Sequence, residues 1–246
     1  MQSRTGLTVR TFAPAQTAGQ PPVLLVHGFG SDGGRDWVDT GIARALTAAG
    51  RVVIAPDLRG HGDSPAPATV AEVAVPALVA DLVTVVNEAG AEAFDVVGYS
   101  LGARLAWELP AAAPGRLGRA VLGGLSPVEP FAAVDVLALR RAVADGVEPA
   151  DPFTAMIAGM VRAHGPRATG LARCVEGLRA TPFAPRSWAG GTPPVFVAGA
   201  DDVMTRGMEQ VAQSVDGARW VSVPGDHQGA LTGDAFRRTV LEVLAG

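Results

Sequence analysis

Gly98-Tyr99-Ser100-Leu101-Gly102 has the form G-x-S-x-G and lies between an apolar run at residues 94–97 and a helical pattern at residues 103–107. A serine on a tight turn from a strand into a helix is held in a strained backbone conformation that lifts its hydroxyl away from the sheet. Only residues with little or no side chain fit beside such a turn, which accounts for the glycine on each side. The pattern predicts that Ser100 is a nucleophile, although a chain with 31 glycines also permits an ordinary glycine-rich turn.

Two further segments favour the nucleophile. Residues 23–30, VLLVHGFG, combine a buried-strand pattern with a glycine loop, and residues 57–64 read DLRGHGDS. Together with residues 98–102 they resemble the α/β-hydrolase superfamily, in its serine-nucleophile, esterase- and lipase-like branch with a small helical cap. The resemblance covers nearly the whole chain and is weakest between residues 126 and 188. It implies the α/β-hydrolase fold, an α/β architecture with a doubly wound, mostly parallel sheet and a helical cap insertion.

Composition excludes several partners. The chain has 246 residues, enough for one domain with a modest insertion. Its net charge of −4 comes without acidic or basic blocks, so we expect no nucleic acid and no anionic membrane as a partner. The most apolar stretch, residues 70–86, is interrupted by Glu72, Pro76 and Asp81, which argues against a membrane span. A small-molecule substrate is the expected partner, and the residues predict no particular oligomeric state.

Cysteine and histidine usage bears on compartment and cofactors. The lone cysteine, Cys174, cannot form an internal disulfide, and residues 1–6 lack the apolar core of a signal peptide. We therefore expect a cytoplasmic protein. Histidine and cysteine do not cluster at metal-ligand spacing, so we expect no metal and no organic cofactor.

The missing residue types exclude other chemistry. All 20 basic residues are arginines, which rules out Schiff bases, Ser–Lys dyads, P-loops and the Tyr-x-x-x-Lys pair of short-chain dehydrogenases. Tyr99 is the single tyrosine. Epoxide hydrolases of the superfamily use cap tyrosines and an aspartate nucleophile, and haloalkane dehalogenases also use an aspartate at that position. Because Ser100 stands there in this chain, we expect neither activity.

Apolar runs alternate with helical patterns along most of the chain, which predicts a parallel sheet with helices on both faces. Strands are expected at residues 7–12, 22–27, 52–56, 94–98, 120–123, 195–198 and 220–223, and helices at 40–49, 70–89, 101–112, 206–214 and 230–244. Thr69 and Glu72 predict a capping box for the second helix. Pro76 predicts that the same helix starts late or kinks.

Residues 126–188 interrupt the alternation and contain no convincing strand. We expect three helices here, near residues 132–145, 151–164 and 167–180. They would form a small helical cap (126–188) on an α/β-hydrolase core made of residues 1–125 and 189–246. The candidates for substrate contact in the cap are Phe131, Met156, Met160 and Phe183. The alternative is that these side chains only pack the cap onto the core.

A serine hydroxyl needs a base within hydrogen-bonding reach, and the base needs an acid that orients it. The resemblance implies that serine, acid and histidine follow one another in that order along the chain. His227 follows the last expected strand and is the predicted base. Asp201 and Asp202 both follow the preceding strand. The superfamily's G-x-x-D spacing favours Asp202, and Asp201 is the alternative.

Acyl transfer also requires backbone N–H donors aimed at the developing oxyanion. Leu101, directly after the nucleophile, is placed to supply one of them. The resemblance implies that Phe29 supplies the other. His27, two residues earlier, is expected to be structural, and residues 59–62 are expected to support the loop.

These residues predict a serine hydrolase that cleaves a carboxylic ester, lactone or thioester of a small to medium substrate through an acyl-serine intermediate. One alternative is a lyase. Tyr99 and Arg104 match positions that bind a polyanionic substrate in the pyruvate-eliminating succinyl-cyclohexene-carboxylate synthase of the menaquinone pathway. Arg140, Arg141 or Arg162 would add carboxylate contacts there, whereas Arg104 would otherwise be a helix-surface arginine. The other alternative is a non-catalytic, ligand-binding member of the fold.

Overall fold

The protein is described here by a computed structural model that covers residues 3–185 and 187–244. Residues 1, 2, 245 and 246 of the predicted core and residue 186 of the predicted cap lie outside the described residues. The described strands form one seven-stranded sheet in the order β1-β3-β2-β4-β5-β6-β7. Their bounds are β1 Val9–Phe12, β2 Val23–Val26, β3 Val53–Pro56, β4 Phe94–Tyr99, β5 Leu117–Gly123, β6 Val195–Gly199 and β7 Arg219–Val223. Every predicted strand is present, with ends that differ by a few residues.

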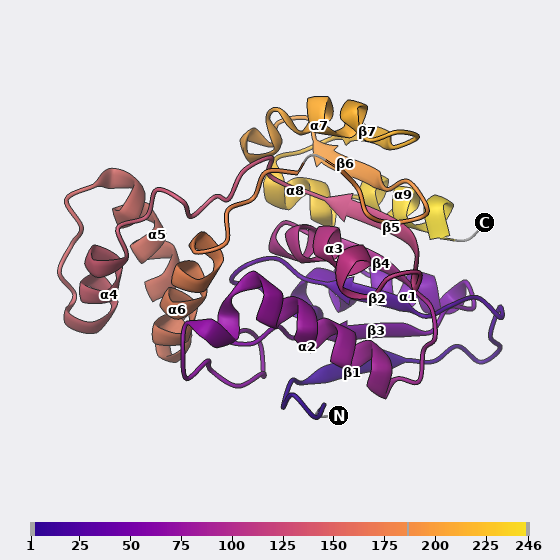
Figure 1. The fold of residues 1–246 in the computed structure, drawn as a ribbon, viewed down its shortest axis with the longest axis horizontal. Coiled ribbons are helices and arrows are strands. Elements are labelled where there is room, and N and C mark those ends of the chain that lie inside the picture. Colours follow the sequence, from indigo (N-terminus) through magenta and orange to yellow (C-terminus); the bar gives the residue numbers. More distant parts are fainter. Residues whose placement is uncertain (1–2, 186, 245–246) are drawn as a thin grey trace.

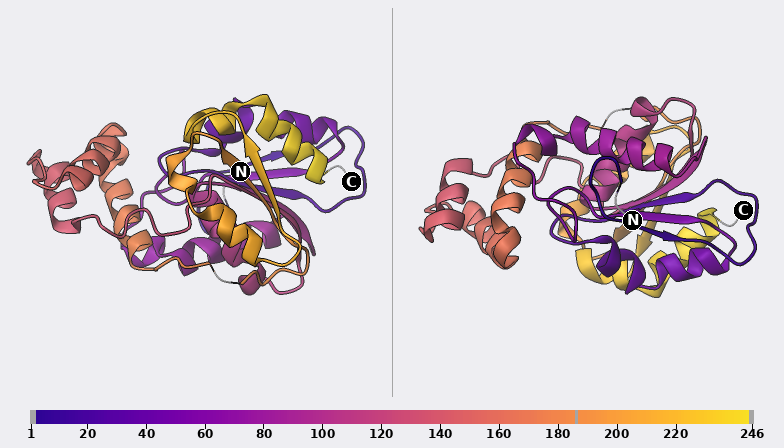
Figure 2. Two further views of the ribbon diagram at one scale, coloured as in Figure 1. Left: turned by 90° about the horizontal axis from the view of Figure 1, so that it is seen from above. Right: turned by 90° about the horizontal axis from the view of Figure 1, so that it is seen from below.

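The sheet is doubly wound and mostly parallel, as predicted. Only β1 runs antiparallel, beside β3, and the other neighbours pair in parallel. Parallel strands need crossover connections, so helices lie on both faces. Figures 1 and 2 show α1 and α9 on one face and α2 and α3 on the other, and two separate apolar clusters of the core fill these two layers.

The helices follow the sequence pattern in most places. Their bounds are α1 Ile42–Ala48, α2 Val75–Glu88, α3 Leu101–Ala112, α4 Val136–Asp145, α5 Pro152–Arg162, α6 Ala168–Arg179, α7 Met208–Ser214, α8 His227–Thr232 and α9 Asp234–Leu244. Short 3-10 turns lie at Ala71–Val73, Gly165–Arg167 and Val203–Thr205, and a π-helical turn lies at Gly34–Val38. None of the helices in residues 3–185 and 187–244 combines the length and apolar character needed to cross a bilayer.

Two helix predictions need correction. α2 starts late, as Pro76 predicts, and Pro76 lies in its first turn, where a proline ring meets no preceding helical carbonyl. The predicted capping box at Thr69 is therefore wrong, because the Glu72 carboxylate accepts from the Ala68 N–H (3.0 Å) within the loop before α2. The single helix predicted at 230–244 is two helices, because Gly233 adopts extended backbone (φ −76°, ψ 147°) between α8 and α9.

The described residues between β5 and β6 form α4, α5 and α6, close to the three predicted helices. The side chain of Asp151 caps α5 and Pro152 occupies its first turn, while Gly146 ends α4 in the left-handed region (φ 70°). Figure 1 shows the three helices together beyond the end of the sheet. The division of the chain into a core and a cap at residues 126–188 stays a prediction.

The parallel strands direct their carboxyl ends to one edge of the sheet, and this edge carries the loops that hold chemistry in such folds. The segments that follow β2, β4, β5, β6 and β7 carry, in this order, Phe29, Ser100, Glu129, Asp202 and His227, the last at the start of α8. Residues far apart in the sequence are therefore brought together at one place.

Candidate active site

Ser100 lies on the sharp turn between β4 and α3. It is the one non-glycine residue among those described with a positive φ (54°). A Cβ added to Gly98 would lie 2.3 Å from the carbonyl oxygen of Gly102, and one added to Gly102 would lie 1.8 Å from the carbonyl oxygen of Val26. The turn therefore packs its backbone against α3 and β2 too closely for any side chain, which is the physical reason for the two glycines.

His227 begins α8, just after β7, and its ring is held by one carboxylate. Its Nδ1 donates to Oδ2 of Asp202 at 2.7 Å. The Asp202 side chain is fully buried, and its Oδ1 accepts from the backbone N–H of Met204 at 2.9 Å. With Nδ1 bound to the carboxylate, Nε2 is the nitrogen left to take a proton from another group.

Of the two neighbouring aspartates, only Asp202 contacts the histidine. Asp201 is exposed, and its backbone N–H donates to the carbonyl oxygen of Gly225 (3.1 Å). The structure thus brings Asp202 to His227 and leaves Asp201 at the surface.

A cavity of about 300 Å³ opens beside Ser100. Ser100 and His227 both line it, but no hydrogen bond joins their side chains in the part of the chain that the structure describes. Contacts of this kind are often long without substrate and shorten in the reacting complex. Phe29 and Leu101 also line the cavity, and neither backbone N–H donates to another described residue. Two free amides therefore lie at the same cavity as the serine.

The four cap candidates also line this cavity. Phe131 and Phe183 are buried, and the ring of Phe131 packs edge-on against Phe29 at 4.9 Å. Met156 and Met160 are 59% and 38% exposed, so they lie at its mouth. The phenylalanines therefore combine a packing role with a place on the cavity wall, while the two methionines have exposed side chains there.

Tyr99 does not reach the cavity, and its prediction as a substrate-binding residue needs correction. Its side chain is buried beneath the site, and its phenol donates to the backbone carbonyl oxygen of His227 at 2.5 Å. Burial also raises the pKa of this phenol, so it stays protonated and remains a donor. Successive side chains along a strand point to opposite faces of the sheet. The side chain of Tyr99 points to the face covered by α9, where its ring packs against Phe236.

Arg104 lines the cavity and is only 5% exposed, so the helix-surface reading is wrong. Its guanidinium lies 4.1 Å from the ring centre of Phe183, and Nη1 donates to Oε1 of Glu108 at 2.5 Å. Its Nε is buried without a partner in the described residues.

Glu129 is a cavity residue that sequence reasoning missed. It lies in the loop between β5 and α4, is 6% exposed, and its Oε1 accepts from the backbone N–H of Phe131 at 3.0 Å. Burial raises the pKa of its carboxyl, while the Phe131 N–H and the charge of Arg104 act against this rise. No motif marks a glutamate in a loop, so only the fold reveals it.

The other arginines considered for a polyanionic substrate lie elsewhere. Arg140 pairs with Glu176, and Arg162 pairs with Glu148 (2.8 Å). Neither they nor Arg141 line the cavity.

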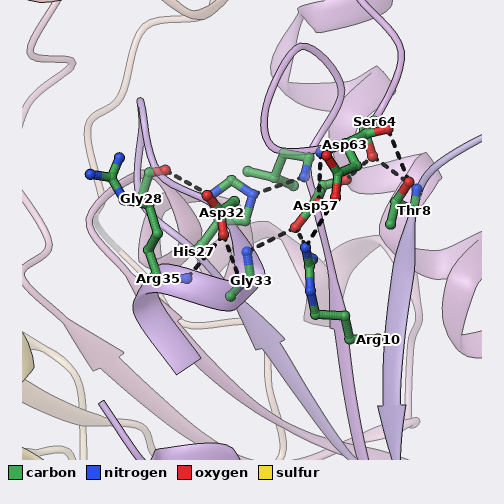
Figure 3. A network of polar contacts seen from close by, with 12 residues as sticks. Thr8, Arg10, His27, Gly28, Asp32, Gly33, Arg35, Asp57, Asp63 and Ser64 are labelled. Atoms are coloured by element: carbon green, nitrogen blue, oxygen red, sulfur yellow. Dashed lines mark hydrogen bonds and ion pairs between the residues drawn. The ribbon is translucent and has the colours of Figure 1, made fainter. Parts of the chain in front are cut away.

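The loop that carries Phe29 is supported by buried polar contacts, shown in Figure 3. Nε2 of His27 accepts from the Leu58 N–H at 2.9 Å, and Nδ1 contacts the carbonyl oxygen of Gly28 at 2.8 Å. Asp57 accepts from the N–H groups of Gly33 and Asp63, both at 2.9 Å. His27 is therefore structural, as predicted, and it ties the loop after β2 to the loop after β3.

His61 completes this support. Its ring lies 5.4 Å from that of Phe29 and 5.3 Å from that of His27, and Nδ1 donates to the carbonyl oxygen of Arg59 at 3.1 Å. Complete burial, together with the neighbouring His27, lowers the pKa of His61 to about 3. A neutral imidazole thus packs beneath the aromatic ring of the Phe29 loop.

Within the described residues, no three side chains of histidine, cysteine, aspartate or glutamate gather closely enough to hold a metal ion.

Comparison with known proteins identifies the family. The family model described as the alpha/beta hydrolase fold matches residues 21–145, just over half of the chain. The chain belongs to this family. The match includes β2, β3, β4 and β5 and the turn that carries Ser100.

Individual relatives are similar over different lengths. Epoxide hydrolase A of Mycobacterium tuberculosis is 38% identical over 92 residues, which are 37% of this chain and only 28% of that protein. A solved enol-lactonase from Burkholderia xenovorans is 24% identical and superimposes with a TM-score of 0.74 over 98% of this chain and 96% of that one. A solved hydrolase from Pseudomonas aeruginosa is 25% identical, with a TM-score of 0.74 over 100% and 97% of the two chains.

Proposed function

We propose that this protein is a serine hydrolase that cleaves a carboxylic ester, lactone or thioester of a small to medium substrate. The observation that carries the proposal is the Asp202–His227 contact of 2.7 Å beside a strained serine on the wall of one cavity. A carboxylate that orients an imidazole, and a serine on a strained turn, are the parts that nucleophilic acyl transfer needs.

In the proposed reaction, Oγ of Ser100 attacks the carbonyl carbon and His227 Nε2 takes the hydroxyl proton. The backbone N–H groups of Phe29 and Leu101 donate to the oxyanion that forms. His227 then gives its proton to the leaving oxygen or sulfur, and the acyl group remains on Ser100. A water molecule attacks this acyl group with His227 again as the base, which releases the acid and restores the serine.

The division of the chain into a core (1–125 and 189–246) and a cap (126–188) belongs to the proposal. The cap side chains Phe131, Met156, Met160 and Phe183 then form the substrate-facing wall opposite the serine. The reaction needs neither a metal nor an organic cofactor, because serine, imidazole and backbone amides supply every step.

Other chemistries of the family fit the site less well. Epoxide opening in this superfamily uses an aspartate nucleophile and cap tyrosines, whereas this site has Ser100 and its single tyrosine lies below the cavity. A polyanionic lyase substrate needs several cations, but Arg104 is the only arginine among the described lining residues, and the chain has no lysine. Because the match covers only 28% of the epoxide hydrolase relative, the proposed activity rests on the residues of this site.

The test is ester turnover with p-nitrophenyl esters of graded acyl length. Ser100→Ala should lower kcat/KM by about 10³-fold or more, because removal of the nucleophile leaves only binding and oxyanion stabilisation. Ser126→Ala is the matched control, since Ser126 lines the same cavity and has no role in the mechanism. Equal turnover by wild type and Ser100→Ala would overturn the proposal.

A further inference from the structure

A carboxyl group and a guanidinium share the wall of the proposed active-site cavity. The ionisable side chains that line it are Arg104, Glu129 and His227, and most of the remaining lining residues are apolar. Since His227 is engaged by Asp202, the other two are left to recognise the substrate. Buried polar groups are costly unless they are hydrogen-bonded, so two of them in an apolar cavity call for a function.

Arg104 lies one helical turn after the nucleophile. Its backbone N–H donates to the carbonyl oxygen of Ser100 at 3.0 Å, and residues four apart lie on one face of a helix. Its guanidinium forms an ion pair with Glu108, and one of its flat faces is covered by the ring of Phe183. Its Nε–H is a buried hydrogen-bond donor that lacks a partner in the described residues.

Glu129 brings the complementary capacity. It forms no ion pair within residues 3–185 and 187–244, and one backbone N–H, from Phe131, holds its Oε1. A carboxylate accepts hydrogen bonds, and a protonated carboxyl also donates one. The carboxyl thus has hydrogen-bonding capacity beyond the bond that it already makes.

Charge decides which ligand suits this pair. Around Arg104, one positive charge faces the carboxylates of Glu108 and Glu129, so there is no surplus of positive charge for an anion. An anionic substrate group would be repelled by these carboxylates, whereas a neutral hydroxyl both accepts from a donor such as Nε–H and donates to a carboxylate.

We propose that Glu129 and Arg104 recognise a neutral hydroxyl group of the substrate, so that the site prefers hydroxylated esters to their apolar isosteres and to anionic esters. The inference rests on the proposed ester hydrolysis where it concerns turnover, but the binding of a hydroxylated ligand does not depend on that reaction. Because Arg104 and Glu129 line the same cavity as Ser100, one substrate molecule carries both the recognised hydroxyl and the reacting carbonyl.

Isosteric pairs of esters test the inference. Ethyl 3-hydroxybutyrate is compared with ethyl 3-methylbutyrate, and 2-hydroxyethyl butyrate with propyl butyrate, so that each pair exchanges a hydroxyl for a methyl on one side of the ester. Monoethyl succinate supplies the anionic case. In wild type, kcat/KM should favour the hydroxylated member of at least one pair by about tenfold or more, since a site built for a hydroxyl rejects the analogue without one.

The variants assign this preference to the pair. Glu129→Leu should bring the hydroxyl-to-methyl ratio close to one, and Glu129→Gln, whose amide still donates and accepts, should keep part of it. Glu148→Leu is the matched control, because Glu148 is an exposed cap glutamate outside the cavity, and it should leave the ratio at its wild-type value. A thermal melt of each variant confirms that it is folded.

A binding experiment separates the inference from the proposed reaction. Ser100→Ala is titrated calorimetrically with both members of each pair, where cleavage plays no part. Tighter binding of a hydroxylated ester by about tenfold supports the inference even if wild type cleaves no ester. The absence of ester cleavage would overturn only the proposed function. Equal affinity within both pairs, a ratio that survives in Glu129→Leu, or a preference for monoethyl succinate would overturn the inference.

Discussion

The phenol of Tyr99 donates a hydrogen bond of 2.5 Å to the backbone carbonyl oxygen of His227. The contact joins the residue before the nucleophile, at the end of β4, to the first residue of α8. The ring of Tyr99 is itself held edge-on against Phe236, at 5.4 Å between ring centres. Tyr99 thus fixes the backbone position of the proposed base from below, which ties its geometry to that of Ser100.

Removal of this hydrogen bond should slow the reaction without weakening substrate binding. In Tyr99→Phe the ring stays packed, but the carbonyl oxygen of His227 loses its donor, so the free energy of unfolding should fall by about 1 kcal/mol. We expect kcat to fall about tenfold with little change in KM, because the base is displaced and substrate contacts are not. The rate of serine labelling by a fluorophosphonate should fall by the same factor. An unchanged kcat would show that the contact does not position His227.

The contact of Asp202 with His227 predicts a sharp difference between the adjacent aspartates. Asp202→Asn keeps the size of the side chain but lowers the preference for a proton on Nδ1, so kcat should fall about 10³-fold or more. Asp201→Asn should change kcat less than about threefold, because Asp201 is exposed and does not contact the ring. Steady-state kinetics on one ester measures both. The reverse order of effects would make Asp201 the orienting acid.

Backbone strain at Ser100 should be measurable as stability. Its φ of 54° is unfavourable for any residue with a Cβ and nearly free for glycine. Ser100→Gly should therefore be more stable than Ser100→Ala by about 1 kcal/mol in urea unfolding, although glycine usually destabilises a folded chain. Both variants lack the hydroxyl, so the comparison isolates the turn. A Ser100→Ala protein at least as stable as Ser100→Gly would show that the turn is unstrained.

The buried His61 predicts a pH dependence of stability. Its pKa is lowered from 6.5 to about 3 in the folded state, so between these values the unfolded chain binds a proton that the folded protein does not. The free energy of unfolding therefore falls as pH falls through this window, by up to about 1.4 kcal/mol per pH unit from this one group. His61→Asn should have a shallower slope in urea unfolding at several pH values.

His164→Asn is the control for this slope. His164 is only partly buried, and its pKa is lowered less strongly, by burial and by Arg35 and Arg167. It should therefore alter the slope less than His61→Asn does. Parallel stability curves for wild type and His61→Asn would contradict a neutral buried imidazole at position 61.

The fold was largely predictable because its signals are local. Continuous apolar runs such as residues 23–26 indicate buried parallel strands, and glycines at 98 and 102 mark a turn that admits no side chain. The errors lie at the ends of helices: Thr69 does not cap α2, and Gly233 breaks the last predicted helix in two.

The site was less predictable, because sequence does not give the direction of a side chain. Tyr99 stands beside Ser100 in the chain, yet it points below the sheet edge and contacts the backbone of His227. Arg104 would be expected at a helix surface because it is charged, but it is buried, with its guanidinium packed against the ring of Phe183. Glu129 belongs to no motif, and its place on the cavity wall depends on where the loop after β5 runs. All three depend on contacts between distant segments.

The most direct test of the account is the identity of the residue that a fluorophosphonate modifies, read by intact mass and peptide mapping. The account predicts a single adduct on Ser100, no adduct in Ser100→Ala, and labelling slowed by about 10³-fold or more in His227→Ala, because the hydroxyl is a poor nucleophile without its base. An adduct on another residue, or labelling of His227→Ala at the wild-type rate, would contradict the assignment of Ser100 and His227 as nucleophile and base.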